Sequence, residues 1–214
     1  MTIAGSDRVV LDADPDDRPW RPASSGPSFV YVIPCIGEDI LKLGMSRDPL
    51  ERFQTLHPRY FDFFDFDAGF LIQTDTVREA RSIEMLLGRQ IALHRAPAPL
   101  TVSHNAGGDT EWYRGALRHL TRAAVEHGQL GYTVHRPMVS WMQGAMKNRG
   151  SQLFHWSAQM LDVIEQQRGP FPASSPPTPL ERTLRNALEA FTAFELPFEG
   201  LVPDAVVRWY GGRP

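Results

Sequence analysis

Hydrophobic and polar positions along this chain follow first a strand-like and then a helix-like period. Two short runs rich in β-branched and aromatic residues, at 29–33 and 40–46, flank Gly37-Glu38-Asp39 and predict a β-hairpin. A similar run at 66–72 predicts a third strand. With the helices predicted around them, these strands indicate an α+β fold: a small, three-stranded, mainly antiparallel sheet flanked by helices.

Two helices are predicted within this first part from their start signals. Asp48-Pro49-Leu50-Glu51 places an N-cap aspartate, a proline at the first helical position and a glutamate at the third. Thr76 and Glu79 form a capping box that opens a second helix over 76–93. The Pro-, Gly- and Asn-rich stretch at 96–110 then predicts a loop.

The rest of the chain is predicted to be helical. Helices are expected over 115–127, 137–147 and 151–167, and another begins at the capping box Thr178-Pro179-Leu180-Glu181. We therefore divide the chain into a disordered leader (1–27), a compact module (28–114) and a helical extension (115–214) with a Pro-rich linker near 169–179.

One glutamate does not fit the helix that contains it. In the predicted helix 76–93, Glu84 lies in the apolar sector between Ala80, Leu87 and Ile91. An unpaired buried carboxylate costs several kcal/mol or more, so such a group is normally protonated, paired or bound to a cation. Taken alone, Glu84 is better explained as a carboxylate at the edge of the core that bonds a backbone amide or a nearby arginine, and the neighbouring sequence changes this interpretation.

Composition narrows the class of protein. The 214 residues are 42% hydrophobic with a net charge of −3, and no run approaches the ~20 apolar residues of a membrane span. The first residues lack a basic start followed by an apolar run, so no secretory signal is predicted. A single cysteine, Cys35, excludes an intramolecular disulfide and Cys-based zinc sites. We expect a cytoplasmic protein without a membrane partner.

Three polar side chains on different predicted elements suit the hydrolysis of a phosphodiester. Arg52, one turn into its helix, can clamp phosphate oxygens in bidentate fashion. Glu84 can hold a divalent metal that neutralises charge on the leaving oxygen. Tyr31, in the first strand, can orient or deprotonate water.

With these residues in this order, the chain resembles the GIY-YIG nuclease superfamily, in particular its phage- and bacterial-type branch. The resemblance covers about 29–114, and four motifs in order are more specific than any one of them. The matching segments are Val30-Tyr31-Val32, Leu41-Lys42-Leu43-Gly44-Met45-Ser46, Asp48-Pro49 with Arg52, the helix 80–91 with Glu84, and Asp109-Thr110-Glu111-Trp112-Tyr113. The resemblance implies a divalent-metal-dependent DNA endonuclease with Mg²⁺ or Mn²⁺ at Glu84.

The chain also departs from the family pattern. Lys42 occupies the tyrosine position of the second motif, and a lysine can contact phosphate or the nucleophile but cannot supply a phenolate. His57 lies where the family often has a histidine and could assist proton transfer. Asn105 lies where some members place a polar residue beside the metal. The resemblance therefore implies Tyr31, Lys42, Arg52, His57 and Glu84 as catalytic candidates.

Each of these residues also has a purely structural interpretation. Tyr31 could be a core aromatic, Arg52 a solvated helix residue and Lys42 part of an exposed strand face. The alternative function is a catalytically weak or inactive module that binds DNA or protein and is regulated by a partner. A further alternative is a nuclease subunit whose helical extension binds a protein partner or a second copy.

The extension is the one net-positive part, with 10 basic and 8 acidic residues in 115–214. Lys147 and Arg149 lie in a predicted turn and are candidates for DNA phosphate contacts. Trp141 and Trp156 are interleaved with cations, as on nucleic-acid surfaces, but the better interpretation places them in a core formed by the packed helices.

Overall fold

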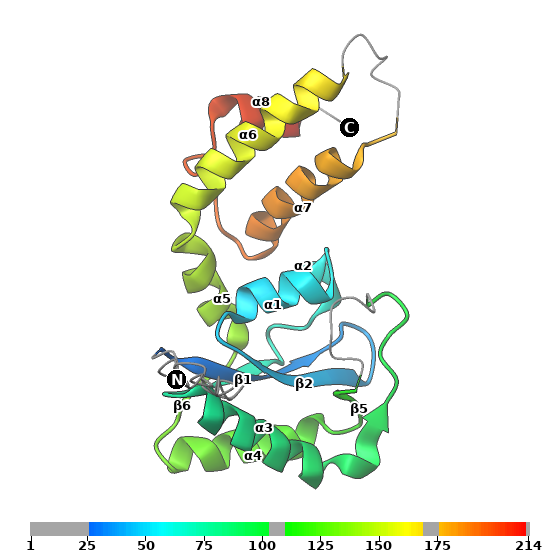
Figure 1. Cartoon of the computed structure of the whole chain (residues 1–214), viewed down its shortest axis with the longest axis vertical. Helices are drawn as coiled ribbons and strands as arrows, with labels where there is room; N and C mark the ends of the chain where they lie inside the picture. Colours follow the sequence, from blue (N-terminus) through cyan, green and yellow to red (C-terminus); the bar gives the residue numbers. More distant parts are fainter. Residues whose placement is uncertain (1–25, 103–109, 169–175, 213–214) are drawn as a thin grey trace, which may run out of the picture.

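The computed structural model describes residues 26–102, 110–168 and 176–212. Its strands form one antiparallel sheet in the order β4-β5-β2-β1-β3-β6 (Figure 1). The strands are β1 (Ser28–Pro34), β2 (Ile40–Ser46), β3 (Phe70–Thr74), β4 (Arg95–Ala96), β5 (Trp112–Arg114) and β6 (Thr133–His135).

Helices cover both faces of this sheet. In Figure 1, α1 and α2 lie on one face, α3 and α4 lie on the other, and α6, α7 and α8 are stacked beyond α1 and α2. The helices are α1 (Pro49–Leu56), α2 (Tyr60–Phe63), α3 (Val77–Gln90), α4 (Leu117–Gln129), α5 (Met138–Lys147), α6 (Gly150–Arg168), α7 (Pro179–Ala193) and α8 (Asp204–Gly211), with a short 3-10 turn, η1 (Ala92–His94), after α3.

The predicted α+β class is confirmed, but the predicted three-stranded sheet is wrong. The hairpin β1–β2 and strand β3 form its centre, and three further strands of two or three residues extend it. Strands this short show no readable alternation, which is why the pattern missed them. The third strand begins at Phe70 rather than 66, because Asp65 Oδ1 accepts hydrogen bonds from the amides of Asp67 and Ala68 and holds a turn there.

The predicted helix starts are confirmed by their caps. Asp48 Oδ1 accepts from the Glu51 amide at 3.1 Å, and Pro49 begins α1. Thr76 Oγ1 accepts from the Glu79 amide at 3.2 Å at the start of α3. Thr178 and Glu181 form the complete capping box of α7. Local sequence therefore determines where these helices begin.

The alternation of the strands produces two hydrophobic cores. Val30 and Val32 of β1 pack with α3 and α4 on one face. Phe29, Tyr31 and Ile33 pack with α1, α2 and the helices α5–α8 on the other. Because β6 pairs with β3 and α4 packs beside α3, the sheet and its cover continue past residue 114. Residues 1–25 of the predicted leader and 169–175 of the linker lie outside the described residues.

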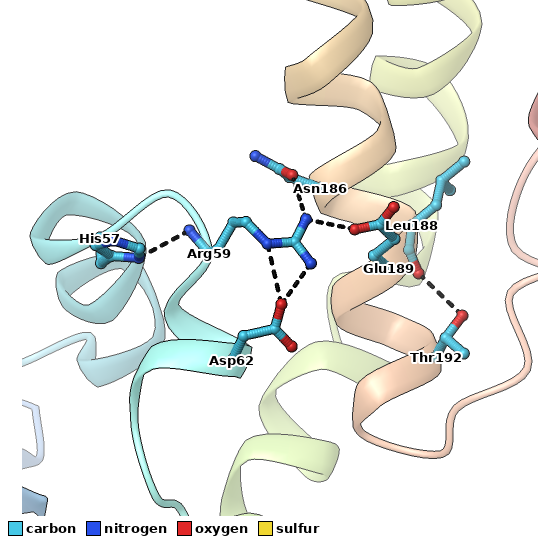
Figure 2. Close-up of polar contacts among 7 residues, drawn as sticks. All are labelled: His57, Arg59, Asp62, Asn186, Leu188, Glu189 and Thr192. Carbon is cyan, nitrogen blue, oxygen red and sulfur yellow. Dashed lines mark hydrogen bonds and ion pairs between the residues drawn. The ribbon is translucent and has the colours of Figure 1, made fainter. Parts of the chain in front are cut away.

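Arg59 connects the sheet-bearing part to α7. Figure 2 shows its guanidinium between Asp62, in α2, and Asn186 and Glu189, in α7. The Nη1 atom donates to Asn186 Oδ1 at 3.0 Å and to the Glu189 carboxylate. A second ion pair joins Arg149, before α6, to the N-cap residue Asp48 of α1. The helical extension is thus tied to the N-cap residues of α1 and α2. Within the described ranges, no helix is both long and apolar enough to cross a membrane.

Candidate functional site

Tyr31 and Arg52 contact each other on the face of the sheet that α1 covers. Tyr31 is buried in β1 opposite Gly44 of β2, and its hydroxyl accepts a hydrogen bond from Arg52 Nε at 3.4 Å. A Cβ atom on Gly44 would lie 2.4 Å from the Tyr31 hydroxyl oxygen, so only glycine leaves room for the ring at this position. Gly44 therefore fixes the Tyr31 hydroxyl beside the guanidinium, which α1 supplies.

Lys42 is fully buried and paired, not part of an exposed strand face. Its side chain has 0% exposure and lies 5.3 Å from the ring centroid of Trp112, its partner across β2 and β5. The Nζ atom donates to Glu111 Oε2 at 3.4 Å. A buried ammonium is stable only with such a partner. Glu111, half-buried before β5, therefore balances the charge of Lys42.

Glu84 interacts electrostatically with members of both the Tyr31–Arg52 pair and the Lys42–Glu111 pair. Burial is the main cause that raises the pKa of this half-buried carboxyl from 4.5 to about 7, and Glu111 raises it further. Lys42, Arg81 and Arg52 act in the opposite direction. The predicted site residues Tyr31, Lys42, Arg52 and Glu84 therefore form one electrostatic cluster, with Glu111 as its fifth member.

The sheet topology explains how residues from both faces come together. Strand β5 pairs with β2 only over Ile40–Lys42, and the Leu43 amide donates to the Glu111 carbonyl at 3.1 Å as the last bond of that ladder. Among the described strands, β2 has no neighbour on that side from Gly44 onward. Strand β2 supplies Lys42 at the end of this pairing, and it is contacted by α1, which carries Arg52, and by α3, which carries Glu84.

The protonation states restrict what each side chain can do. Burial raises the pKa of Tyr31 to about 12 despite the opposing effect of Arg52, so the phenol is neutral near pH 7. It can donate a hydrogen bond to a water molecule or a phosphate oxygen. Burial lowers the pKa of Lys42, and Glu111 opposes this shift. Loss of a proton from Lys42 is therefore easier than from a lysine in water.

The donors in the cluster fit a divalent cation of the magnesium type. Glu84 and Glu111 both carry hard oxygen ligands, and the Glu111 carboxylate is close enough to raise the pKa of Glu84. No group of three or more His, Cys, Asp or Glu residues that could hold a metal occurs in the described ranges. Mg²⁺ commonly takes one or two carboxylates and completes its shell with water and substrate phosphates. Glu84 and Glu111 could supply those one or two carboxylate ligands.

The other predicted site residues lie elsewhere. His57 caps the end of α1, where its Nδ1 accepts from the Arg59 amide at 3.2 Å and its ring stacks on Phe63 (Figure 2 shows the bond to Arg59). Burial lowers the pKa of His57, and no member of the cluster contributes to that shift. Lys147 is exposed at the end of α5, while Arg149 pairs with Asp48. Asn105 and Asp109 lie outside the described residues.

Two residues in the site had no role assigned from sequence. Glu111 was visible only as part of an acidic–aromatic segment, and Gly44 only as part of a motif. The alternation of Lys42 with Leu41 and Leu43 on β2 is typical of an exposed strand face, so the sequence does not indicate that Lys42 is buried and needs an acidic partner. Nothing in the sequence indicates which acid.

No family model, curated protein or solved structure matches this chain. The resemblance to GIY-YIG nucleases therefore stays a prediction from its motifs.

Proposed function

We propose that this protein is a divalent-metal-dependent endonuclease that hydrolyses phosphodiester bonds in DNA. The observation that supports it best is the contact between Arg52 and Tyr31, with Glu84 in the same electrostatic field. A guanidinium, a neutral phenol and a carboxylate, carried by α1, β1 and α3 around β2, provide the functions that phosphodiester hydrolysis needs.

Each side chain takes one role in the proposal. Arg52 binds the scissile phosphate, and its half-buried position limits competition from water. Tyr31 hydrogen-bonds and orients the attacking water. Glu84 holds Mg²⁺ or Mn²⁺, which would supply positive charge near the leaving oxygen. Lys42, fully buried, acts through Glu111, whose carboxylate it holds beside Glu84.

The matched variants Arg52→Lys and Arg52→Ala test the phosphate clamp. Lysine keeps the charge but loses the bidentate fork and the Nε contact to Tyr31, so we expect nicking of supercoiled plasmid to fall by about tenfold or more in both variants. Thermal stability should stay near that of wild type, because Arg52 is not part of a core. Wild-type nicking by Arg52→Lys would show that Arg52 is only a solvated helix charge.

A second candidate function is a DNA- or protein-binding module without catalysis. It is favoured by the burial of Lys42 at the position where the family pattern has a tyrosine. In the same plasmid assay, wild type that shifts the mobility of the DNA but leaves it supercoiled with Mg²⁺ or Mn²⁺ would support this candidate. Co-purification of a partner, or a dimer by light scattering, would indicate regulation through the extension.

The double variant Lys147→Ala with Arg149→Ala tests the predicted DNA contacts of the extension. If both cations bind phosphates, duplex affinity falls and the slope of log K against log salt decreases by up to about two units. The ion pair of Arg149 with Asp48 gives this variant a second effect, on the link to α1, so each single variant is measured too. Unchanged affinity and slope in Lys147→Ala would show that this lysine contacts solvent only.

A further inference from the structure

Helices α3 and α4 lie side by side in opposite directions. At one end, the Tyr132 hydroxyl, just after α4, donates to Glu79 Oε1 of α3 at 2.8 Å. At the other end, the rings of His94, just after α3, and His119 of α4 are 5.3 Å apart. Both helices bury their apolar sides in the same core against the sheet. Their outward sides therefore form one continuous surface, the α3–α4 face.

This face carries a concentration of exposed arginines. On α3 they recur at spacings of three and eight residues, which keeps them on one side of the helix. On α4 two more are four residues apart. The exposed arginines are Arg78, Arg81, Arg89, Arg118 and Arg122. In a chain with net charge −3, such clustering on one surface stands out.

The acidic residues of the two helices do little to neutralise this face. Glu79 is half-buried and bonded to Tyr132, and Glu84 belongs to the site. Glu126 is exposed and pairs with Arg122, leaving Arg78, Arg81, Arg89 and Arg118 in excess. Surface pairs of this kind contribute little energy and are readily exchanged for a phosphate.

The arginines also lead to the site. Arg81 lies three residues before Glu84 in α3, so the two side chains are neighbours on the helix surface and the face reaches the cluster there. From Arg78 to Arg89 the helix rises about 16 Å, which corresponds to roughly five nucleotides along a duplex. Arginine is the side chain best suited to bind phosphate oxygens in pairs.

We infer that the α3–α4 face binds the phosphate backbone of a DNA duplex and leads it to the edge of β2 where Glu84 and Arg52 lie. This inference rests on the proposed function and supplies its main binding surface. Contacts to phosphates without base contacts give affinity that is independent of sequence and strongly dependent on salt.

The test is duplex binding by the full chain in EDTA, measured by fluorescence anisotropy on a labelled DNA of about 20 base pairs over a range of salt. We expect Arg78→Ala with Arg89→Ala to weaken binding by about tenfold or more at low salt and to lower the salt slope by about two units. The matched control is Arg182→Ala with Arg208→Ala, which removes the same charge from exposed positions on α7 and α8. It should bind within about twofold of wild type, because affinity falls mainly with lost phosphate contacts. Thermal melting confirms that both variants are folded.

Several outcomes would overturn the inference. The first is that Arg78→Ala with Arg89→Ala binds the duplex with the same affinity and the same salt slope as the control variant. The second is that the wild type does not bind the duplex. A third is arginine-dependent binding to phosphatidylserine vesicles with no effect on DNA, which would assign the face to a membrane surface. The two proposals fail in different ways. Arginine-dependent DNA binding without plasmid nicking would refute catalysis but not the binding surface. Plasmid nicking with an unaltered KM in Arg78→Ala with Arg89→Ala would refute the binding surface but not catalysis.

Discussion

Replacing Glu84 by glutamine is expected to slow plasmid nicking by about a hundredfold or more, the largest effect we predict for the site. Glutamine keeps the shape of the side chain but removes the charge that would hold the cation. The measurement is the initial rate of supercoiled-plasmid loss with Mg²⁺ and with Mn²⁺. A glutamine variant that nicks at the wild-type rate under Mg²⁺ would show that Glu84 does not hold the metal.

The same substitution should reveal the cost of the buried charge in the absence of metal. Because the pKa of Glu84 is about 7 in the folded chain against an ordinary 4.5, the folded state binds the proton more tightly than the unfolded state. The charge therefore destabilises the fold fully above pH 7, and this effect disappears as the pH falls towards 4.5. In EDTA, Glu84→Gln should melt above wild type at about pH 8 and equal to it near pH 4.5. A lower melting temperature under the alkaline condition would contradict the burial of an uncompensated charge.

Replacing Gly44 by alanine is expected to reduce both stability and activity. The added Cβ would lie 2.4 Å from the Tyr31 hydroxyl oxygen and 2.5 Å from its Cζ, and Tyr31 is only 1% exposed, so the ring must shift within a packed core. Overpacking of this kind costs about 1–3 kcal/mol. The hydroxyl should leave Arg52, and nicking should fall by about tenfold or more, since a displaced group loses its orientation.

Gly144 provides the matched control for this substitution. It lies in α5, and an added Cβ there would have no other atom within 4 Å, so Gly144→Ala should be neutral or stabilise the helix by roughly 0.5–1 kcal/mol. Urea unfolding gives the free energies, and the plasmid assay gives the rates. Equal stability and activity of the two alanine variants would show that the Tyr31 ring is not confined by Gly44.

The sequence predicted the fold best where interactions between residues close in sequence determine the structure. The caps at Asp48, Thr76 and Thr178 fix three helix starts, and the alternation at 29–33 and 40–46 gives the central hairpin. Strands β4, β5 and β6 depend on pairing with distant partners, and α8 carries no capping side chain. Such elements form because tertiary contacts favour them, so local patterns do not reveal them.

In the candidate site, too, features that depend on local patterns were predictable and features that depend on tertiary contacts were not. The misfit of Glu84 was visible because a helix has a regular period, although in the structure it is half-buried at the boundary of the apolar side. The burial of Lys42 and its pairing with Glu111, 69 residues away, depend on the register of β2 with β5. The position of His57 depends on packing between α1 and α2, where it stacks on Phe63.

Metal-dependent cleavage through Glu84 is tested most directly by plasmid nicking with wild type and Glu84→Gln, expressed and purified in parallel, each with Mg²⁺ and with EDTA. The account predicts nicked circles with wild type and Mg²⁺, and intact supercoiled plasmid in the other three reactions over the same time. Equal nicking by the two proteins, or nicking by wild type that persists in EDTA, would contradict it.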